Sequence, residues 1–405
     1  MSQVLSPRVV IVPSLQDAAR EMELAEVSPG GIRAMAGKCR TLVIKVVDAD
    51  VPTAHILKQQ MLSLGGDAAV AKDVLVHGVD STDVLLIGTH VQMRELTRKL
   101  GWQPFGLPEL GEKIAALLDT VEGTPRGVVR ARRHELRLGE RAHIMAVLNV
   151  TPDSFSDGGE FLQPSEALDH ALRMADEGAD IIDVGGQSSR PGSEPVSEED
   201  ELKRVVPVIS RIAEEWKGPI SVDTYRSRVA KDALEVGASM VNDITALSGD
   251  ERMPSVIADS DAACVLMHMK GTPADMQNDP SYGDVVGEIA FFLHEAIERA
   301  RAAGIADDRI MVDPGIGFGK TAGHNLTILR RLSELAVLDM PVVVGTSRKA
   351  FIGKVLDLPV TDRLEGTIAT AVYAVAQGAR VLRVHDVAPV SRAVRMVEAC
   401  LSPPE

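Results

Sequence analysis

The sequence has few cysteines and too few basic residues to balance its acids. Its 405 residues include three cysteines, Cys39, Cys264 and Cys400, which stand far apart. A disulfide framework or a structural zinc site needs closely spaced cysteines, so neither is expected, and a reducing cytoplasm suits the chain. The formal net charge of -15 at pH 7 disfavours nonspecific binding to nucleic acid or anionic membranes. An anionic substrate therefore needs a local basic pocket.

Long hydrophobic runs are also missing, and no stretch approaches the length of a membrane-spanning helix. The N-terminus lacks the basic segment followed by an apolar one that marks a secretion signal. We therefore expect an unexported protein that acts on small molecules, without nucleic acid or membrane partners. With 45% hydrophobic and 25% charged residues, the chain has the ordinary balance of a globular protein.

Three segments of different character divide the chain. Residues 1–125 contain short β-branched runs and amphipathic patterns, which predict a small α/β domain of unknown role. Residues 126–133 are rich in arginine and are expected to form a linker, with a basic patch as the alternative. Residues 134–405 form the third segment, in which apolar runs and helical patterns alternate regularly.

In this third segment, eight apolar runs each precede a helical pattern. The runs are continuously apolar, which is typical of parallel strands buried on both faces. Eight β/α repeats in roughly 260 residues predict a (β/α)8 TIM barrel, with a doubly wound open sheet as the alternative. Residues 136–138 predict half of a short hairpin that closes the barrel floor. The predicted strands are 144–150, 181–185, 220–223, 240–244, 263–268, 310–313, 342–345 and 381–385.

Polar or charged side chains end every one of these predicted strands. In a TIM barrel the carboxyl ends of the strands meet at one rim, where the active site lies. Asp223, Asn242 and Asp313 are each as able to cap a turn as to bind a ligand. Three acid or amide groups facing one cavity, however, suit a planar heterocycle with a guanidine-like edge, such as a pterin.

Basic residues occur at the same strand ends. Lys349 and Arg383 can balance the acids, in a chain whose charge is otherwise negative. Arg383, together with His385 and Asn149, equally predicts a site for an anion such as diphosphate. Met267 either belongs to the core or presents its adaptable thioether to a flat ring.

Seven motifs at these strand ends resemble those of dihydropteroate synthases, in the same order. They are residues 149–159 (NVTPDSFSDGG), 186–192 (GQSSRPG), 222–224 (VDT), 242–243 (ND), 313–320 (DPGIGFGK), 347–349 (SRK) and 383–386 (RVHD). The resemblance implies a transferase that joins 6-hydroxymethyl-7,8-dihydropterin diphosphate to p-aminobenzoate and releases diphosphate in folate biosynthesis. It also implies Mg²⁺ as cofactor and a homodimer.

The resemblance assigns roles to single residues. Those implied to be catalytic are Asp313, Lys349, Arg383 and His385. Those implied to bind the pterin or line its pocket are Asp223, Asn242, Asp313, Lys349, Met267, Gly317 and Phe318. The diphosphate would be held by Asn149, Arg383 and His385, and Mg²⁺ by Asn149 and Asp157. The first two loops would close over p-aminobenzoate with Phe155, Asp157, Ser189, Arg190 and Pro191.

Three residues depart from the family pattern. Gln187 stands where Glu is usual and Ser189 where Thr is usual, and both changes are mild. Ala350 replaces a common Ser and removes a possible hydrogen bond to the p-aminobenzoate carboxylate, so a related aromatic amine stays open as acceptor.

Two alternative functions are also compatible with a pterin-binding barrel. One is a methyltransferase that passes a methyl group from a reduced folate to a corrinoid protein. It would need neither the first two loops nor residues 347–349. The other is a noncatalytic pterin sensor, suggested by the additional N-terminal domain.

Overall fold

The computed structural model describes residues 8–76, 78–104, 106–122, 127–150, 164–187, 196–272 and 275–401. Two compact units, Met1–Gly123 and Thr124–Glu405, make up the chain, and each is described by itself. Within the described ranges, no helix combines the length and the apolar character needed to cross a membrane.

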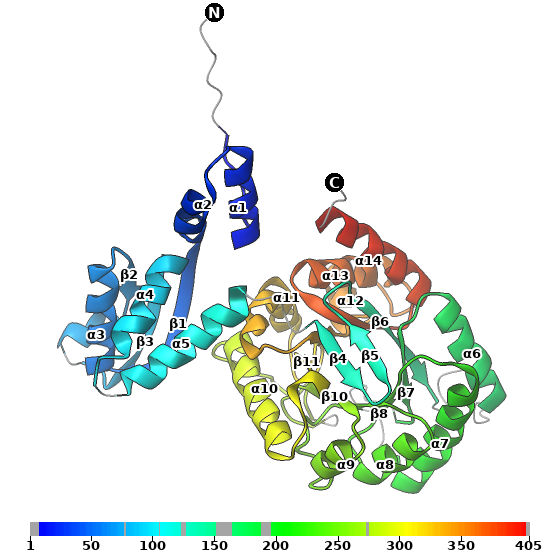
Figure 1. The fold of residues 1–405 in the computed structure, drawn as a ribbon. Helices are drawn as coiled ribbons and strands as arrows, with labels where there is room; N and C mark the ends of the chain where they lie inside the picture. Colours follow the sequence, from blue (N-terminus) through cyan, green and yellow to red (C-terminus); the bar gives the residue numbers. More distant parts are fainter. Residues whose placement is uncertain are drawn as a thin grey trace, which may run out of the picture. The chain divides into compact units, whose positions relative to one another are not determined.

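The first unit is a three-stranded antiparallel sheet in the order β1-β3-β2, with helices packed on one face (Figure 1). Ile44 and Leu86 of this sheet are buried against helix residues such as Leu57 and Leu96. Val43, on the opposite face of its strand, is 61% exposed. The elements are α1 Leu15–Leu24, α2 Pro29–Met35, η1 Ala36–Lys38, β1 Thr41–Asp50, α3 Val51–Ser63, β2 Asp67–Ala69, η2 Lys72–Val76, β3 Ser81–Thr89, α4 His90–Leu100 and α5 Leu107–Glu122. The expected small α/β unit is confirmed.

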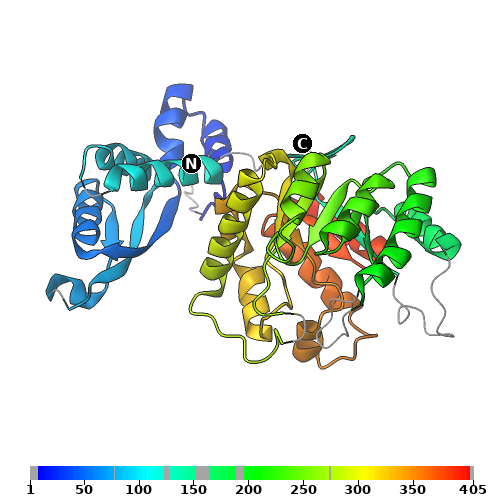
Figure 2. The same cartoon turned by 90° about the horizontal axis from the view of Figure 1, so that it is seen from below.

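The second unit is a closed barrel of eight parallel strands, β6 to β13, surrounded by helices (Figures 1 and 2). The strands are β6 His143–Asn149, β7 Ile181–Gly185, β8 Ile220–Asp223, β9 Met240–Asp243, β10 Ala263–Met267, β11 Ile310–Asp313, β12 Val342–Val344 and β13 Ala379–Val384. The predicted TIM barrel is confirmed, and the open sheet is ruled out.

Helices follow the barrel strands. They are α6 Pro164–Asp176, α7 Glu198–Glu215, α8 Ser227–Glu235, α9 Met253–Asp259, α10 Val285–Ala302, η4 Asp307–Arg309, α11 Ala322–Arg330, η5 Leu332–Leu338, α12 Ala350–Leu356, α13 Leu364–Ala376 and α14 Val387–Leu401. The strand boundaries predicted from the sequence agree with the observed ones to within two residues, and the differences fall at strand ends, where assignments vary most.

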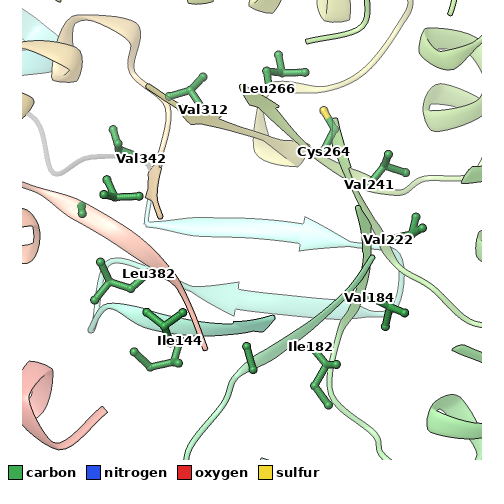
Figure 3. Packing of buried hydrophobic residues seen from close by; sticks show 14 of the residues in the cluster. Ile144, Ile182, Val184, Val222, Val241, Cys264, Leu266, Val312, Val342 and Leu382 are labelled. Carbon is green, nitrogen blue, oxygen red and sulfur yellow. The ribbon is translucent and has the colours of Figure 1, made fainter. Parts of the chain in front are cut away.

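Successive side chains of each barrel strand point alternately toward the helices and toward the barrel interior. Figure 3 shows Ile144, Ile182 and Val222 directed outward, where the helices cover them. Inward side chains such as Met145 and Met311 form a second buried cluster inside the barrel. Each fully buried aliphatic side chain contributes roughly 1.5–3 kcal/mol, so both faces stabilise the barrel. This two-sided burial explains the continuous apolar strands.

Residues 126–133, expected to form a linker, instead contribute a strand. Strand β4, Val128–Ala131, pairs antiparallel with β5, His134–Arg137, as a hairpin. Val129 and Leu136 pack on the inward-facing cluster, which confirms the hairpin expected at the barrel floor. The linker prediction was wrong because the arginines mask an alternating pattern in which only every second residue packs on the barrel. Arg132, at the turn, donates to the carbonyl oxygens of residues 234 and 238 at 2.6 and 2.9 Å.

Candidate active site

Inward residues at the carboxyl ends of four neighbouring strands lie side by side. In register, Asn149 of β6 pairs with Gly185 of β7, Gly185 pairs with Asp223 of β8, and Asp223 pairs with Asn242 of β9. A Cβ built on Gly185 would lie 3.6 Å from Asp223 Oδ2 and 3.7 Å from Asn149 Oδ1. The missing side chain at Gly185 thus leaves space between two oxygen-bearing side chains.

Arg383 of β13 donates to two carboxylates, Asp183 on β7 and Asp223 on β8. Its Nε donates to Asp183 Oδ2 at 2.7 Å, and its Nη2 donates to Asp223 Oδ2 at 2.6 Å. Asp183, on β7, has no exposed surface and also accepts a hydrogen bond from Asn242 Nδ2 at 3.2 Å. One guanidinium and two carboxylates therefore connect four strands through charge-assisted hydrogen bonds.

Burial and the neighbouring charges shift the pKa values of Asp223 and Arg383. Burial raises the pKa of Asp223 to about 7, because the opposing effect of Arg383 is incomplete and the neighbouring Asp183 adds like charge. Burial alone would lower the pKa of Arg383, but Asp183 and Asp223 outweigh it and raise that pKa. Asp223 consequently exchanges its proton near neutral pH, whereas Arg383 stays charged.

Asp313 ends β11 and is fixed by the glycine-rich loop that follows. Its Oδ1 accepts a hydrogen bond from Gly315 N at 2.6 Å. Gly315 has a φ of 66°, and a side chain there would overlap the carbonyl oxygen of His268, so the turn requires glycine. Burial raises the pKa of Asp313, although Lys349 and the Gly315 hydrogen bond oppose the shift.

Lys349, which follows β12, extends its side chain over the same loop. Its Nζ donates to the carbonyl oxygen of Ile316 and lies 4.6 Å from the centre of the Phe318 ring. A Cβ on Gly317 would lie 3.1 Å from Lys349 Cδ, so a side chain at this position would crowd the lysine. Burial lowers the pKa of Lys349 to about 8, while Asp313 acts in the opposite direction. Lysine, carboxylate and aromatic ring are thus brought together.

The end of β13 carries two further polar contacts. Ser347 Oγ accepts from His385 N at 3.2 Å and lies 3.1 Å from His385 Nδ1. Met267, at the end of β10, is 4% exposed and pairs in register with Asp313. The strand-end residues predicted from the sequence therefore gather at one end of the barrel.

Comparisons with known proteins agree with this geometry. A family profile described as pterin binding enzyme matches residues 145–385. Dihydropteroate synthase of Synechocystis sp. is 47% identical over 262 residues, which cover 64% of this chain and 91% of that protein. This chain belongs to the dihydropteroate synthase family. It is accordingly a transferase of folate biosynthesis.

Two further comparisons concern the two units of this synthase. The crystal structure of Yersinia pestis dihydropteroate synthase with a sulfonamide drug complex covers 68% of this chain and 99% of that one, with 44% identity and a TM-score of 0.65. A probable bifunctional folylpolyglutamate synthase/dihydropteroate synthase of Halobacterium salinarum is 41% identical over 390 residues, 96% of this chain but 46% of that protein. The likeness to the bifunctional protein therefore extends into the first unit.

Some predicted residues of the synthase site cannot be compared with the structure. Phe155, Asp157, Ser189, Arg190 and Pro191 lie outside the described residues. Their roles toward p-aminobenzoate and Mg²⁺ stay predictions.

Two buried ionisable residues were missed by the sequence analysis. Asp183 was overlooked because only strand ends were considered, although an acid inside an apolar strand is itself a signal. Lys320, in the loop after β11, is 3% exposed, with Nζ 2.9 Å from His268 Nδ1 and 2.9 Å from the carbonyl oxygen of Phe318. Burial lowers the pKa of Lys320 well below its usual value, and burial beside Lys320 lowers that of His268 to about 3. His268 is therefore neutral and packs as a structural residue.

A separate pocket of about 690 Å³ lies near the barrel floor. It is lined by the hairpin turn and by the loops that precede β9 and β10, among them Arg132, Arg133, Glu235 and Asp261. These residues lie at the amino ends of the strands, so this pocket is not the site formed by the strand ends.

Proposed function

We propose that the barrel condenses 6-hydroxymethyl-7,8-dihydropterin diphosphate with p-aminobenzoate, giving 7,8-dihydropteroate and diphosphate. The observation that carries this proposal is the convergence of Asp223, Asn242 and Asp313 with two cations at one end of the barrel. Carboxylate and amide oxygens accept hydrogen bonds from the N–H groups of the pterin edge. Each bond to a charged acceptor contributes roughly 1.5–3 kcal/mol.

In this proposal the pterin lies with its N–H edge toward Asp313 and Asp223. Gly315 N occupies one oxygen of Asp313, so Oδ2 is the acceptor offered to the ligand. Lys349 lies on the same side, where its ammonium group offsets Asp313 and packs against Phe318. Phe318 and Met267 provide apolar surface for the ring.

Diphosphate is proposed to bind to Arg383, His385 and Asn149. Asp183 and Asp223 use one hydrogen each of Nε and Nη2 of Arg383. Among the interactions of the described residues, the two hydrogens of Nη1 and the second hydrogen of Nη2 remain for an anion. During the reaction, the bond from the pterin methylene carbon to the diphosphate oxygen breaks. The bond from that carbon to the amine nitrogen of p-aminobenzoate forms, and the amine releases a proton.

The acids and the cations act on different charges of this transition state. Positive charge develops on the pterin as the diphosphate leaves, and the carboxylate of Asp313 is placed to stabilise it. Arg383 and His385 are proposed to stabilise the negative charge on the departing diphosphate. Because both groups are fixed before the reaction, little reorganisation is needed when the charges separate.

Mg²⁺ is proposed as cofactor, held by the substrate diphosphate and by Asn149, with Asp157 as the second expected ligand. No cluster of three or more His, Cys, Asp or Glu side chains suited to a metal occurs within the described ranges. Mg²⁺ often binds through one or two protein oxygens together with substrate phosphates, and the Asn149 amide oxygen beside the gap at Gly185 suits that mode. When bound, Mg²⁺ would neutralise charge on the leaving diphosphate.

One assay tests the proposed function. Purified protein is incubated with pterin diphosphate, p-aminobenzoate and Mg²⁺, and dihydropteroate and diphosphate are measured. Equal formation of both products supports the proposal, whereas saturating substrates without product would refute it. Tight pterin binding without turnover would instead indicate a sensor, and methyl transfer from a reduced folate would indicate the methyltransferase.

We also propose a homodimer that works in the cytoplasm. Exposed apolar side chains on α12, α13 and α14, including Leu356, Tyr373 and Met396, support a subunit contact on this side of the barrel. Cys39, Cys264 and Cys400 are all unpaired, which suits a reducing compartment. Light scattering of the purified protein would test the dimer, and a monomeric mass would refute it.

A further inference from the structure

We propose that Asp183 is a positioning residue of the pterin site, which sets the orientation of Asn242 and Arg383 without touching substrate. The inference rests on the proposed function, because it concerns two residues that are proposed to bind the pterin diphosphate. It is carried by the hydrogen bonds and the burial of Asp183.

Asp183 lies deeper in the barrel than the strand-end residues. It precedes Gly185 by two positions on β7, so both point inward, and it pairs in register with Ser221 of β8. The side chain has no exposed surface. Apolar side chains fill most neighbouring inward positions, where an ionised carboxylate costs several kcal/mol unless it is paired. A charge at this depth therefore needs an explanation in terms of its partners.

Asn242 is the first of these partners. Its Nδ2 donates to Asp183 Oδ2, so its amide oxygen is turned away from the carboxylate. The reversed amide would place two oxygens against each other, one of them charged, and is disfavoured. Asp183 thereby makes Asn242 present an acceptor, which is the group that an N–H of the pterin edge requires.

Arg383 is the second partner. Asp183 fixes Nε while Asp223 fixes Nη2, so two carboxylates at different depths set the plane of the guanidinium. Without Asp183, the arginine would pair with Asp223 alone and would be able to rotate about that contact. Its remaining N–H groups would then be poorly directed toward the diphosphate.

The same oxygen of Asp183 accepts both hydrogen bonds, which decides the choice of variants. Asp183→Asn keeps one oxygen and can retain both bonds in a weaker, neutral form. Asp183→Leu keeps the branching at Cγ, is larger, and removes the acceptor altogether. Removing one partner of a buried ion pair destabilises the fold, so thermal unfolding of both variants is measured first, and the neutral Asp183→Asn is the milder test of orientation.

The experiment measures binding of pterin diphosphate alone by calorimetry, followed by steady-state kinetics. We expect the Kd to rise about 10- to 100-fold in Asp183→Leu and about 3- to 10-fold in Asp183→Asn, as expected for losing or weakening bonds to a charged acceptor. The KM for p-aminobenzoate should change less than twofold in both variants.

The pH profile provides a readout that a purely structural role would not move. Asp183 contributes to the raised pKa of Asp223, so the acid limb of kcat/KM for pterin diphosphate should move to lower pH in both variants. Asp243→Asn is the matched control. Asp243 is equally buried on β9, but its carboxylate accepts from the backbone of Thr245 and Leu247. This control should keep the wild-type Kd within twofold, and its acid limb should move less than that of the Asp183 variants, because Asp243 raises the pKa of Asp223 less than Asp183 does.

The outcomes separate the two proposals. If the wild type neither binds nor turns over pterin diphosphate, the proposed function fails. If the wild type is active and Asp183→Leu is folded with an unchanged Kd and an unmoved acid limb, only the positioning role is overturned. If Asp183→Leu does not fold, Asp183→Asn decides, and the same two null results in it would overturn the inference.

Discussion

Replacing Asp313 by Asn tests the centre of the site with almost no change in shape. Oδ1 of Asp313 accepts a hydrogen bond from Gly315 N at 2.6 Å, which leaves Oδ2 for the ligand. If Asn keeps its oxygen on Gly315, its amide nitrogen faces the pterin N–H and a donor meets a donor. If the amide flips, the Gly315 N–H loses its acceptor. Either arrangement loses one good hydrogen bond to a charged group.

That loss sets the expected magnitude. A hydrogen bond to a charged acceptor contributes roughly 1.5–3 kcal/mol, which corresponds to about 10- to 150-fold in kcat/KM. The carboxylate also faces the positive charge that develops on the pterin in the transition state. We therefore expect kcat to fall as well as the affinity for pterin diphosphate, because the lost interaction is stronger in the transition state than in the ground state.

The assay is steady-state formation of dihydropteroate with each substrate varied in turn, together with calorimetric binding of pterin diphosphate. Thermal unfolding should first establish that Asp313→Asn is folded. A folded variant whose kcat/KM stays within threefold of the wild type would refute the reasoning. A variant of Lys320 in the same loop would not be a neutral control. Lys320 is 3% exposed, and its ammonium group contacts His268 and the carbonyl oxygen of Phe318.

Four further predictions follow from the fold and from the titration of the site. The kcat/KM for pterin diphosphate should rise with pH through about 7 as Asp223 becomes ionised, and fall above about 8 as Lys349 loses its proton. A flat profile from pH 6 to 9 would contradict this assignment. Leu138→Ala, at a position without exposed surface, should lower the free energy of unfolding by about 2–5 kcal/mol in denaturant titrations. Ala350→Ser should lower the KM for p-aminobenzoate about 2- to 10-fold, through one added hydrogen bond. Deleting residues 1–123 should leave a folded barrel with measurable synthase activity, since this segment is a separate compact unit.

Much of the barrel was predictable because its strands follow a strong rule. A parallel strand buried on both faces is mostly apolar, and most of its inward polar groups lie where the strand ends. Asp223, Asn242 and Asp313 therefore stood out at the boundaries between apolar runs and loops. The structure brings them to one end of the barrel, as that rule requires.

The parts that were missed depend on partners that are distant in the sequence. Asp183 is an acid within an apolar run, and only the barrel geometry reveals Arg383, 200 residues later, as its partner. The hairpin strand β4 was hidden by Arg130 on its exposed face and by Arg132 and Arg133 in the turn that follows. In the first unit, α1, α2, α4 and β2 were not predicted, although Met93, Leu96 and Leu100 of α4 recur at helical spacing on its buried face.

The positions of the charged groups along the barrel axis favour one orientation of the proposed substrate. Asp223 lies two residues nearer the carboxyl end of the barrel than Asp183 on the neighbouring strand, and Arg383 donates to both carboxylates. His385 follows Arg383 by two residues on the way to the rim. Because opposite charges attract, a substrate with an electron-poor N–H edge and an anionic tail has a lower energy with that edge at the acidic floor and the tail at the basic rim. This order of charges supports the proposed binding of an anionic substrate in one orientation by a chain with a net charge of -15.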